Sequence, residues 1–239
     1  LMKDMDKAIQ RIEKAISKNE KILVFGDYDV DGTTAVSLVF SFLQSIYSNI
    51  GYYIPDRYKE GYGISFAGID YAEENNFGLI IALDCGIKSN DKIDYANNKN
   101  IDFIICDHHL PGDELPNAVA VLDQKRADCN YPYKELSGCG IGFKLIQALA
   151  KVYNVADEKV YAYLDLVAIS IASDIVPITG ENRVLTFFGL QKIKKKPRPG
   201  IEALINIALN KDGEIQTSRK RILETMDLVF IIGPRIHAA

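Results

Sequence analysis

The stretch ILVFGDYDVDG, at residues 22–32, decides how the rest of the sequence is interpreted. It begins with four consecutive apolar residues, Ile22 to Phe25, and such a run is typical of a strand buried on both faces of a sheet. A polar loop with two glycines follows, and Thr33 to about Tyr47 has the composition of a helix. This order predicts the first unit of a parallel α/β sheet.

The alternation of strand and helix continues on both sides of this stretch. Apolar residues at helical spacing predict a helix over residues 5–19. Further strands are predicted at 52–54, 79–83, 102–106 and 118–122, with helices at 69–75 and 90–98. Beyond Asp123, helices are predicted at about 141–153, 157–172, 182–194, 200–209 and 217–230. We therefore predict an α/β fold, with a parallel β-sheet flanked by helices and then a mostly helical portion.

The predicted elements divide the chain into three parts. Residues 1–20 form an N-terminal helix, 21–125 an α/β metal-binding core, and 126–239 a mostly helical remainder that leads toward a second domain. Because the first residue is Leu1 rather than Met, we expect a piece excised from a longer chain, ending before that second domain.

Composition is that of an ordinary globular protein, with 48% hydrophobic residues in 239 and a formal net charge of −4. No apolar stretch approaches the roughly 20 residues that span a bilayer, and the start has no signal pattern. Four single cysteines without a C-x-x-C pair fit a reducing compartment, so we expect a cytoplasmic protein. The basic joint Lys192 to Arg198 is either solvated surface or a nucleic-acid contact.

Acidic residues follow three of the predicted strands, at the point where each strand ends. They are Asp27, Asp29 and Asp31 after the first strand, Asp84 after a later one, and Asp107 after the next. The carboxyl ends of parallel strands line one crevice, so these carboxylates should converge. Such a crowd repels itself unless a cation neutralises it. Oxygen ligands with imidazole from His108 and His109 favour Mn²⁺ or Mg²⁺, with Mn²⁺ preferred.

The spacing of the first three aspartates suits two ions. If residues 27–31 are extended, alternate side chains point the same way, and three carboxylates face one pocket. Two ions about 3.5–4 Å apart can clamp both oxygens of a phosphoryl transfer and activate a bridging water. A calcium loop of the EF-hand type is the alternative, but it requires an acid six residues past Gly32, where Leu38 stands.

Four segments of the chain carry a resemblance to a known family. GDYDVDGTT at 26–34, LDCG at 83–86, CDHHLPG at 106–112 and SDIVPI at 173–178 resemble the four motifs of the DHH phosphoesterase superfamily. Within it, IPDRYKEGYGIS at 54–65, SGCGIGFKL at 137–145 and GPRIHAA at 233–239 resemble segments of the RecJ family of single-stranded-DNA-specific exonucleases. The resemblance covers nearly the whole chain in order.

The resemblance implies roles for the site residues. It makes Asp27, Asp29, Asp31, Asp84, His108 and Asp174 metal ligands, with Asp84 bridging two ions and with His108 and Asp174 on the same ion. Asp107 is expected to orient a histidine, and His109 to contact the scissile phosphate. Asp174 enters through the resemblance alone, because it lies in a helical region without a signal of its own.

Substrate-binding residues are also implied. Arg57 suits bidentate capture of a phosphate, although a surface arginine is the alternative. The backbone of Ser137, Gly138 and Gly140 either offers N–H groups to DNA phosphates or forms a helix-capping turn. Lys144 either assists there or lies on a solvated face, and Arg235 resembles a phosphate-contacting arginine.

The function implied is hydrolysis of single-stranded DNA from its 5′ end by a water that two divalent cations activate. DNA repair and recombination follow, with a helicase and a single-strand-binding protein as partners and no membrane. Two departures are present: His237 stands where the family usually has Asn, and the family's second DHH-associated domain and OB-type domain are missing from this sequence. We therefore expect weak DNA binding and slow cleavage by the chain alone.

Three other functions are weighed against this one. A related enzyme that cleaves short oligoribonucleotides or cyclic dinucleotides is the main alternative. An inorganic pyrophosphatase of the same superfamily is disfavoured, because it needs a histidine where Phe25 stands. A non-catalytic scaffold is disfavoured as well, since all the expected metal ligands are present.

Overall fold

The computed structural model describes residues 1–209 and 223–238. Its centre is one parallel sheet of five strands in the order β2-β1-β3-β4-β5. The strands are β1 (Lys21–Gly26), β2 (Ile50–Tyr53), β3 (Phe77–Leu83), β4 (Asp102–Cys106) and β5 (Ala120–Leu122). The predicted α/β fold class is thereby confirmed.

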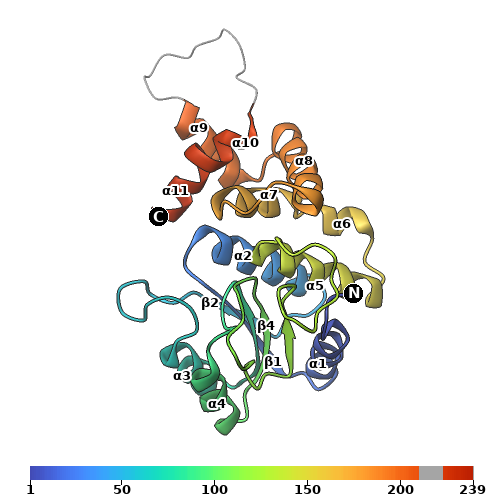
Figure 1. The fold of residues 1–239 in the computed structure, drawn as a ribbon, viewed down its shortest axis with the longest axis vertical. Coiled ribbons are helices and arrows are strands. Elements are labelled where there is room, and N and C mark those ends of the chain that lie inside the picture. The colour runs from blue at the N-terminus through green and yellow to red at the C-terminus, as the bar shows by residue number, and fades with distance from the viewer. Residues whose placement is uncertain (210–222, 239) are drawn as a thin grey trace.

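Helices cover both faces of the sheet (Figure 1). One face packs against α1 (Met5–Ser17), α2 (Val30–Gln44) and α5 (Gly138–Val152), and the other against α3 (Phe66–Glu74) and α4 (Asn90–Asn98). Alternate strand residues feed the two cores: Val24 belongs to the first, whereas Leu23 and Phe25 belong to the second. Burial on both faces explains why the strands are continuous apolar runs.

A helical layer lies over α2 and α5, at the top of Figure 1. It contains α6 (Asp157–Tyr161), α7 (Leu164–Ser173), α8 (Gly180–Lys195), α9 (Pro199–Leu209), α10 (Thr225–Asp227), the π-helical η1 (Leu228–Ile232) and α11 (Gly233–His237). Its core residues join those of α2 and α5 in one continuous apolar cluster. Among the residues that the structure describes, no helix is both long enough and apolar enough to cross a bilayer.

Several of the predicted helices need correction. Those predicted at 69–75 and about 141–153 are α3, which begins at Phe66, and α5, which begins at Gly138. The helix expected at 157–172 is divided into α6 and α7. At the break, the N–H of Leu166 donates to the Tyr163 carbonyl, and the Ala162 carbonyl accepts a hydrogen bond from Arg198 Nη2 at 2.8 Å. The helix expected from Thr33 begins at Val30 instead. The helix predicted at 217–230 falls partly on residues 210–222, which lie outside the described residues; its described part is α10 and η1.

A glycine allows α7 and α8 to approach closely. A Cβ atom on Gly189 of α8 would overlap the Leu164 carbonyl oxygen and would lie 2.6 Å from the Cβ of Ala168. Backbone cannot move aside as a flexible side chain can, so this position requires glycine. The contact matters because α7 ends next to Asp174.

We predict that Gly189→Ala lowers the free energy of unfolding by about 2 kcal/mol, because overpacking outweighs the better helix propensity of alanine. Gly200→Ala in α9 is the matched control, since no heavy atom lies within 4 Å of its added Cβ. Urea unfolding of both variants tests this. Equal stability of the two variants would contradict the packing argument.

Candidate metal centre

Strand register brings three aspartates to one edge of the sheet. Gly26 pairs with Leu83, and Leu83 pairs with Cys106. The residues that follow are therefore level with one another: Asp27, Asp84 and Asp107, all at most 1% exposed. Because these three carboxylates are shielded from water, each needs a hydrogen-bond donor or a cation beside it.

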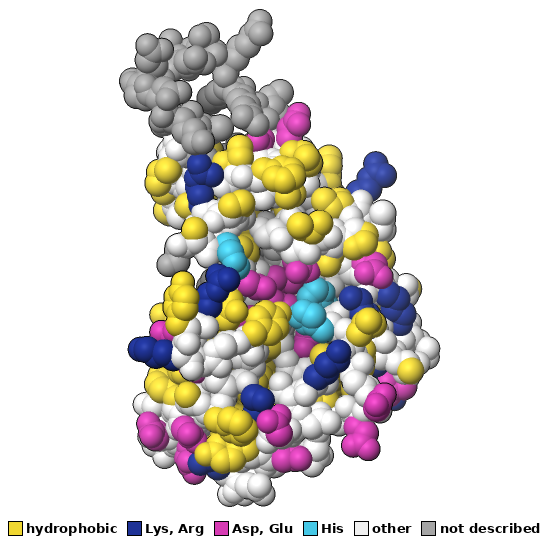
Figure 2. All heavy atoms as spheres, turned by 60° about the vertical axis from the view of Figure 1, so that its left-hand side comes forward, with side chains coloured by type: hydrophobic (Ala, Val, Ile, Leu, Met, Phe, Trp, Pro, Cys, Tyr) yellow, Lys and Arg dark blue, Asp and Glu magenta, His cyan; other side chains and the backbone are white. Residues whose placement is uncertain are grey.

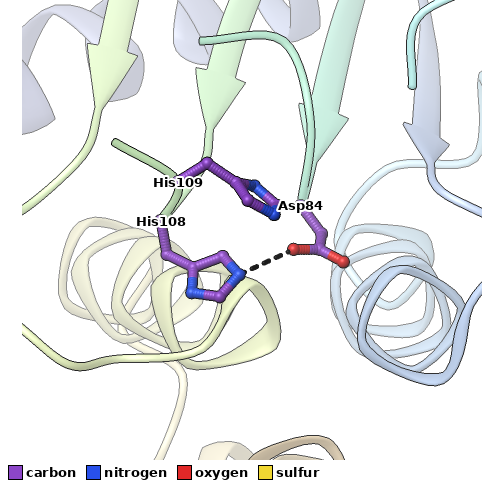
Figure 3. Close-up of side chains that lie close together, drawn as sticks. All are labelled: Asp84, His108 and His109. Atoms are coloured by element: carbon purple, nitrogen blue, oxygen red, sulfur yellow. Dashed lines mark ion pairs between the residues drawn. The ribbon is translucent and has the colours of Figure 1, made fainter. Parts of the chain in front are cut away.

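Asp84 and His108 face each other across this edge (Figure 3). Nε2 of His108 lies 3.1 Å from Oδ1 of Asp84. Both atoms are buried, and neither has a hydrogen-bond partner among the described residues. Asp84 has a left-handed backbone with φ 60°, which turns its side chain into the site. A carboxylate oxygen and an imidazole nitrogen that lie this close without hydrogen bonds form an arrangement that a bound cation would stabilise.

Two further carboxylates approach the same imidazole. Oδ2 of Asp174 lies 3.6 Å from Nε2 of His108, and Oδ2 of Asp31 lies 3.8 Å from it. Two overlapping groups have ligand atoms within 4.8 Å of one another: Asp31, His108 and Asp174, and Asp84, His108 and His109. Beside them is a pocket of about 330 Å³ lined by Asp29, Asp31, Asp174 and His237. Figure 2 shows the acidic side chains at the bottom of this hollow, with histidines at its rim.

The N-terminus of α5 holds Asp31 in place. Asp31 accepts hydrogen bonds from the N–H groups of Gly138 and Cys139, at 2.7 and 2.8 Å, and from Oγ of Ser170, at 2.7 Å. A Cβ on Gly138 would lie 2.6 Å from Oδ1 of Asp84, so glycine is required there.

The same contacts bear on the predicted substrate role of this segment. Ser137 is fully buried and bonded to Ser170, while the N–H of Gly140 donates to Oγ of Ser137. With the N–H of Gly138 donated to Asp31, this arrangement favours positioning of the acidic site over contact with a DNA phosphate.

The expectation that residues 27–31 are extended is wrong, because α2 begins at Val30. Asp29 is the N-cap of α2 and accepts a hydrogen bond from the N–H of Gly32, at 2.8 Å. Asp27 accepts from the N–H of Gly63, at 3.1 Å. The three aspartates therefore reach the site from a strand end, a helix cap and a first helical turn, and Asp27 and Asp29 lie outside the two ligand groups above.

Asp107 orients His109. Its Oδ1 lies 2.7 Å from Nδ1 of His109, and its Oδ2 accepts from the N–H of Ile87, at 2.9 Å. Although burial opposes ionisation, these hydrogen bonds hold the pKa of Asp107 below its usual value. The bond to Asp107 also raises the pKa of His109, whose side chain is 43% exposed toward solvent. The shift at His109 favours the cationic form of its imidazole, whereas burial lowers the pKa of His108 and favours the neutral form.

Asp174, Asp27 and Asp84 resist ionisation, because their pKa values are raised. Burial, and then repulsion from Asp31 and Asp29, raises the pKa of Asp174 to about 7. Burial likewise raises the pKa of Asp27 to about 6, and raises the pKa of Asp84 well above the usual value. A divalent cation would reverse these shifts, because it favours the charged form of every carboxylate near it. The residues present therefore fit a metal centre.

The remaining predicted substrate residues lie in different places. Arg57 lies at the pocket mouth, over the Tyr28 ring, with Nη1 3.3 Å from Nε2 of His237. Lys144 pairs with Glu181 on α8 and lines other pockets, so the structure does not bring it to the acidic site. Arg235 donates to the Ile231 carbonyl of its own helical segment, at 2.7 Å.

Several residues at the site were not predicted from the sequence. The Tyr62 hydroxyl lies 3.4 Å from Nε2 of His109, and Ser170 bonds Asp31 across 139 positions of sequence. Tyr62 stands between two glycines, a pattern that favours a loop, but the pattern does not indicate what that loop contacts. Ser170 has no signal, because a serine inside an apolar helix has no distinctive pattern.

A parallel sheet whose strand ends bring carboxylates and imidazoles into one basin defines an α/β domain with side chains suited to a metal ion. The chain belongs to the DHH family: the family model described as "DHH family, N-terminal domain" matches residues 21–171.

Among proteins of known sequence, the chain is 40% identical over 237 residues to the single-stranded-DNA-specific exonuclease RecJ of Bacillus subtilis, covering 99% of this chain and 28% of that protein. It is 37% identical to the protein of the same name from Escherichia coli, covering 98% of this chain and 41% of that protein. The chain therefore spans well under half of each of these relatives.

Two solved structures are similar to this chain. The crystal structure of exonuclease RecJ bound to manganese matches with a TM-score of 0.85 and 28% identity, over 100% of this chain and 58% of that one. RecJ from Thermus thermophilus in complex with Mn²⁺ matches with a TM-score of 0.79 and 25% identity, over 98% of this chain and 32% of that one.

We predict that manganese stabilises the protein more as pH rises from 5 to 8. The folded-state pKa values of Asp27 (about 6) and Asp174 (about 7) lie above the ordinary 3.8, so without metal the fold binds extra protons and loses stability through this window. Bound Mn²⁺ requires ionised ligands, so its effect grows as they deprotonate.

Thermal unfolding with Mn²⁺ and with EDTA at both pH values measures this. Asp174→Asn cannot ionise at that position and should show a smaller pH dependence. A rise in Tm on adding Mn²⁺ that is the same at both pH values would refute the prediction.

Proposed function

We propose that the chain is the catalytic domain of a metal-dependent phosphodiesterase, an exonuclease that hydrolyses single-stranded DNA from the 5′ end. The observation that carries this proposal is the convergence of Asp31, Asp84, His108 and Asp174 on one buried point, which suits a divalent cation. The similarity to proteins named single-stranded-DNA-specific exonuclease supports the substrate class.

Two divalent cations are part of the proposal, with Mn²⁺ preferred over Mg²⁺. Asp31, His108 and Asp174 would hold one ion, Asp84 would bridge both, and Asp27 and Asp29 would complete the second. When bound, the ions supply an activated water and neutralise charge on the attacked phosphate. The manganese in two related solved structures supports this choice of metal.

In this proposal, His109 contacts the scissile phosphate. Its ring is held by Asp107 at 2.7 Å, and this hydrogen bond raises the pKa of His109, which favours the cationic form. A fixed cation at this place stabilises the negative charge that develops on phosphate oxygens and can donate a proton to the leaving oxygen. Asp107 is buried and contributes by holding the ring.

Arg57 is positioned to hold the phosphate at the end of the strand. Its guanidinium is exposed at the mouth of the acidic pocket, where it stacks on Tyr28 and contacts His237. A guanidinium binds phosphate through paired hydrogen bonds. Capture at the mouth would place the first phosphodiester over the acidic floor.

Digestion by the full-length protein with Mn²⁺ tests the function. The substrates are 5′- and 3′-labelled single strands, duplex DNA, short RNA and a cyclic dinucleotide. Sequential release from the 5′ end of single-stranded DNA is expected. Preference for short RNA or the cyclic dinucleotide would instead identify a related phosphodiesterase, and absence of both Mn²⁺ binding and cleavage would identify a scaffold.

We predict that Asp84→Ala lowers the rate of hydrolysis at least about 100-fold, because it removes the carboxylate that bridges the ions. The fold should persist, since the substitution also removes a repelled buried carboxylate. Asp113→Ala, at an exposed aspartate in the loop after β4, is the control. The bridging role fails if Asp84→Ala retains more than a few per cent of the Mn²⁺-dependent rate.

Arg57→Ala should raise the KM for a 5′-phosphorylated strand about 10-fold and change kcat little, because the lost hydrogen bonds serve capture. Lys59→Ala is the matched control, since Lys59 is 83% exposed on the same loop. Steady-state kinetics with and without the 5′ phosphate separate the two effects. An unchanged KM would refute the assignment.

A further inference from the structure

A second groove lies away from the acidic centre, and we call it the basic groove. It has a volume of about 830 Å³ and is formed by the ends of α2 and α8 with α6 and the starts of α7 and α9. Its cationic lining residues are Lys159, Lys192, Lys196 and Arg198, and Glu158 is the one acid that lines it.

Only some of the cationic side chains of this groove form ion pairs within the protein. Lys192 and Arg198 contact the fully buried Asp165, at 3.1 and 2.8 Å, so these two cations share one carboxylate within the fold and keep one positive charge between them. Lys159 and Lys196 are exposed, and no ion pair of theirs is found among the described residues. The groove therefore keeps cationic donors that face solvent.

The adjoining end of α8 adds more positive charge. Five of the seven residues from 192 to 198 are lysine or arginine and none is acidic, in a chain whose net charge is −4. Lysines at a helix C-terminus are favoured by the helix dipole, which accounts for those in the last turn of α8 and for Lys159 in the last turn of α6. The dipole acts on each helix separately, and it is the fold that brings the two ends to the same groove.

Aromatic rings alternate with these cations. The guanidinium of Arg198 lies 5.1 Å from the Tyr163 ring, and Tyr161 is 47% exposed at the groove. Cationic side chains beside exposed rings are the combination that binds single-stranded nucleic acid, through phosphates and stacked bases. A duplex would offer its phosphates but not its base faces.

The basic groove lies at the opposite end of α2 from the metal centre. Asp29 caps the start of α2, whereas Phe42 and Ser45 at its other end line the groove. A helix of 15 residues is about 22 Å long, so only a strand of several nucleotides can touch both places.

We propose that the basic groove binds the phosphate backbone of single-stranded nucleic acid, at a distance from the metal centre. This proposal rests on the proposed function for the identity of the strand. The groove increases the affinity for long strands, while the hydrolysis of strands too short to reach it proceeds without it.

The test is the double charge reversal Lys159→Glu with Lys196→Glu. Lys192 and Arg198 are left in place because they hold the buried Asp165. The matched control is Lys14→Glu with Lys18→Glu, which makes the same change in net charge at two exposed lysines of the α1 region. Fluorescence anisotropy with a labelled thymidine strand of about 30 nucleotides, in EDTA so that the strand is not cut, gives Kd at several salt concentrations.

We expect the groove variant to bind the long strand at least about 10-fold more weakly near 0.1 M salt, and to lower the slope of log Kd against log salt by about 1.4. The control variant should keep the slope of the unchanged protein. With Mn²⁺, hydrolysis of a strand of about four nucleotides should be equal in all three proteins.

Equal Kd values and slopes for the groove variant and the control would overturn the proposal. So would a groove variant that keeps its affinity for the strand but loses affinity for a poly-glutamate peptide, because the groove would then dock an acidic protein segment. Failure of the proposed function is a separate result: no protein would cut the strand, while the groove variant would still bind it more weakly.

Discussion

Mutual repulsion among buried carboxylates is the constraint on which this structure depends. The parallel register places Asp27, Asp84 and Asp107 side by side at one edge, where water cannot screen them. The protein compensates some of them with its own donors: Asp31 receives two N–H groups and a hydroxyl, and Asp107 receives three N–H groups and an imidazole. Asp84 is different, because its Oδ1 has no partner among the described residues. This uncompensated oxygen is available to a cation.

The distribution of donors separates two kinds of acidic residue. Hydrogen bonds lower the pKa of Asp107, which stays ionised and holds His109. Burial and neighbouring carboxylates raise the pKa of Asp84 and Asp174, which gain most from a metal ion. Asp107 and Asp84 follow neighbouring strands, and the number of hydrogen-bond donors that the fold directs at each makes one suited to holding a histidine and the other suited to binding a cation.

Much of the fold could be predicted because local signals and tertiary packing agree. The β4 strand at 102–106 and the α4 helix at 90–98 were predicted to the residue. The apolar run of the strand and the spacing of apolar residues in the helix are local patterns, and both agree with the burial of these elements in the fold. The convergence of aspartates also followed from topology, because strand ends in a parallel sheet must meet.

The rest depended on contacts that span the sequence. Asp31 is presented by a helix rather than by an extended loop, and only the meeting of α2 with α5 and α7 shows which donors hold it. At the break between α6 and α7, the Ala162 carbonyl likewise accepts a hydrogen bond from Arg198, 36 positions away. Neither contact leaves a pattern in the segment that it changes.

Net charge is another property whose meaning depends on the fold and not on the sequence alone. A value of −4 suggests little attraction for a polyanion, yet the acids and the bases are segregated by the fold. The acids gather where α2 begins, and a metal centre would cancel their repulsion toward phosphate. The bases gather where α2 ends, in Lys159 and the run from 192 to 198. Electrostatic interactions weaken over roughly 8 Å at physiological salt, and the two places are about 22 Å apart. The acidic region and the basic region would therefore act on a bound strand independently of each other. The local arrangement of charge, and not its sum, decides whether a nucleic acid is attracted to this chain.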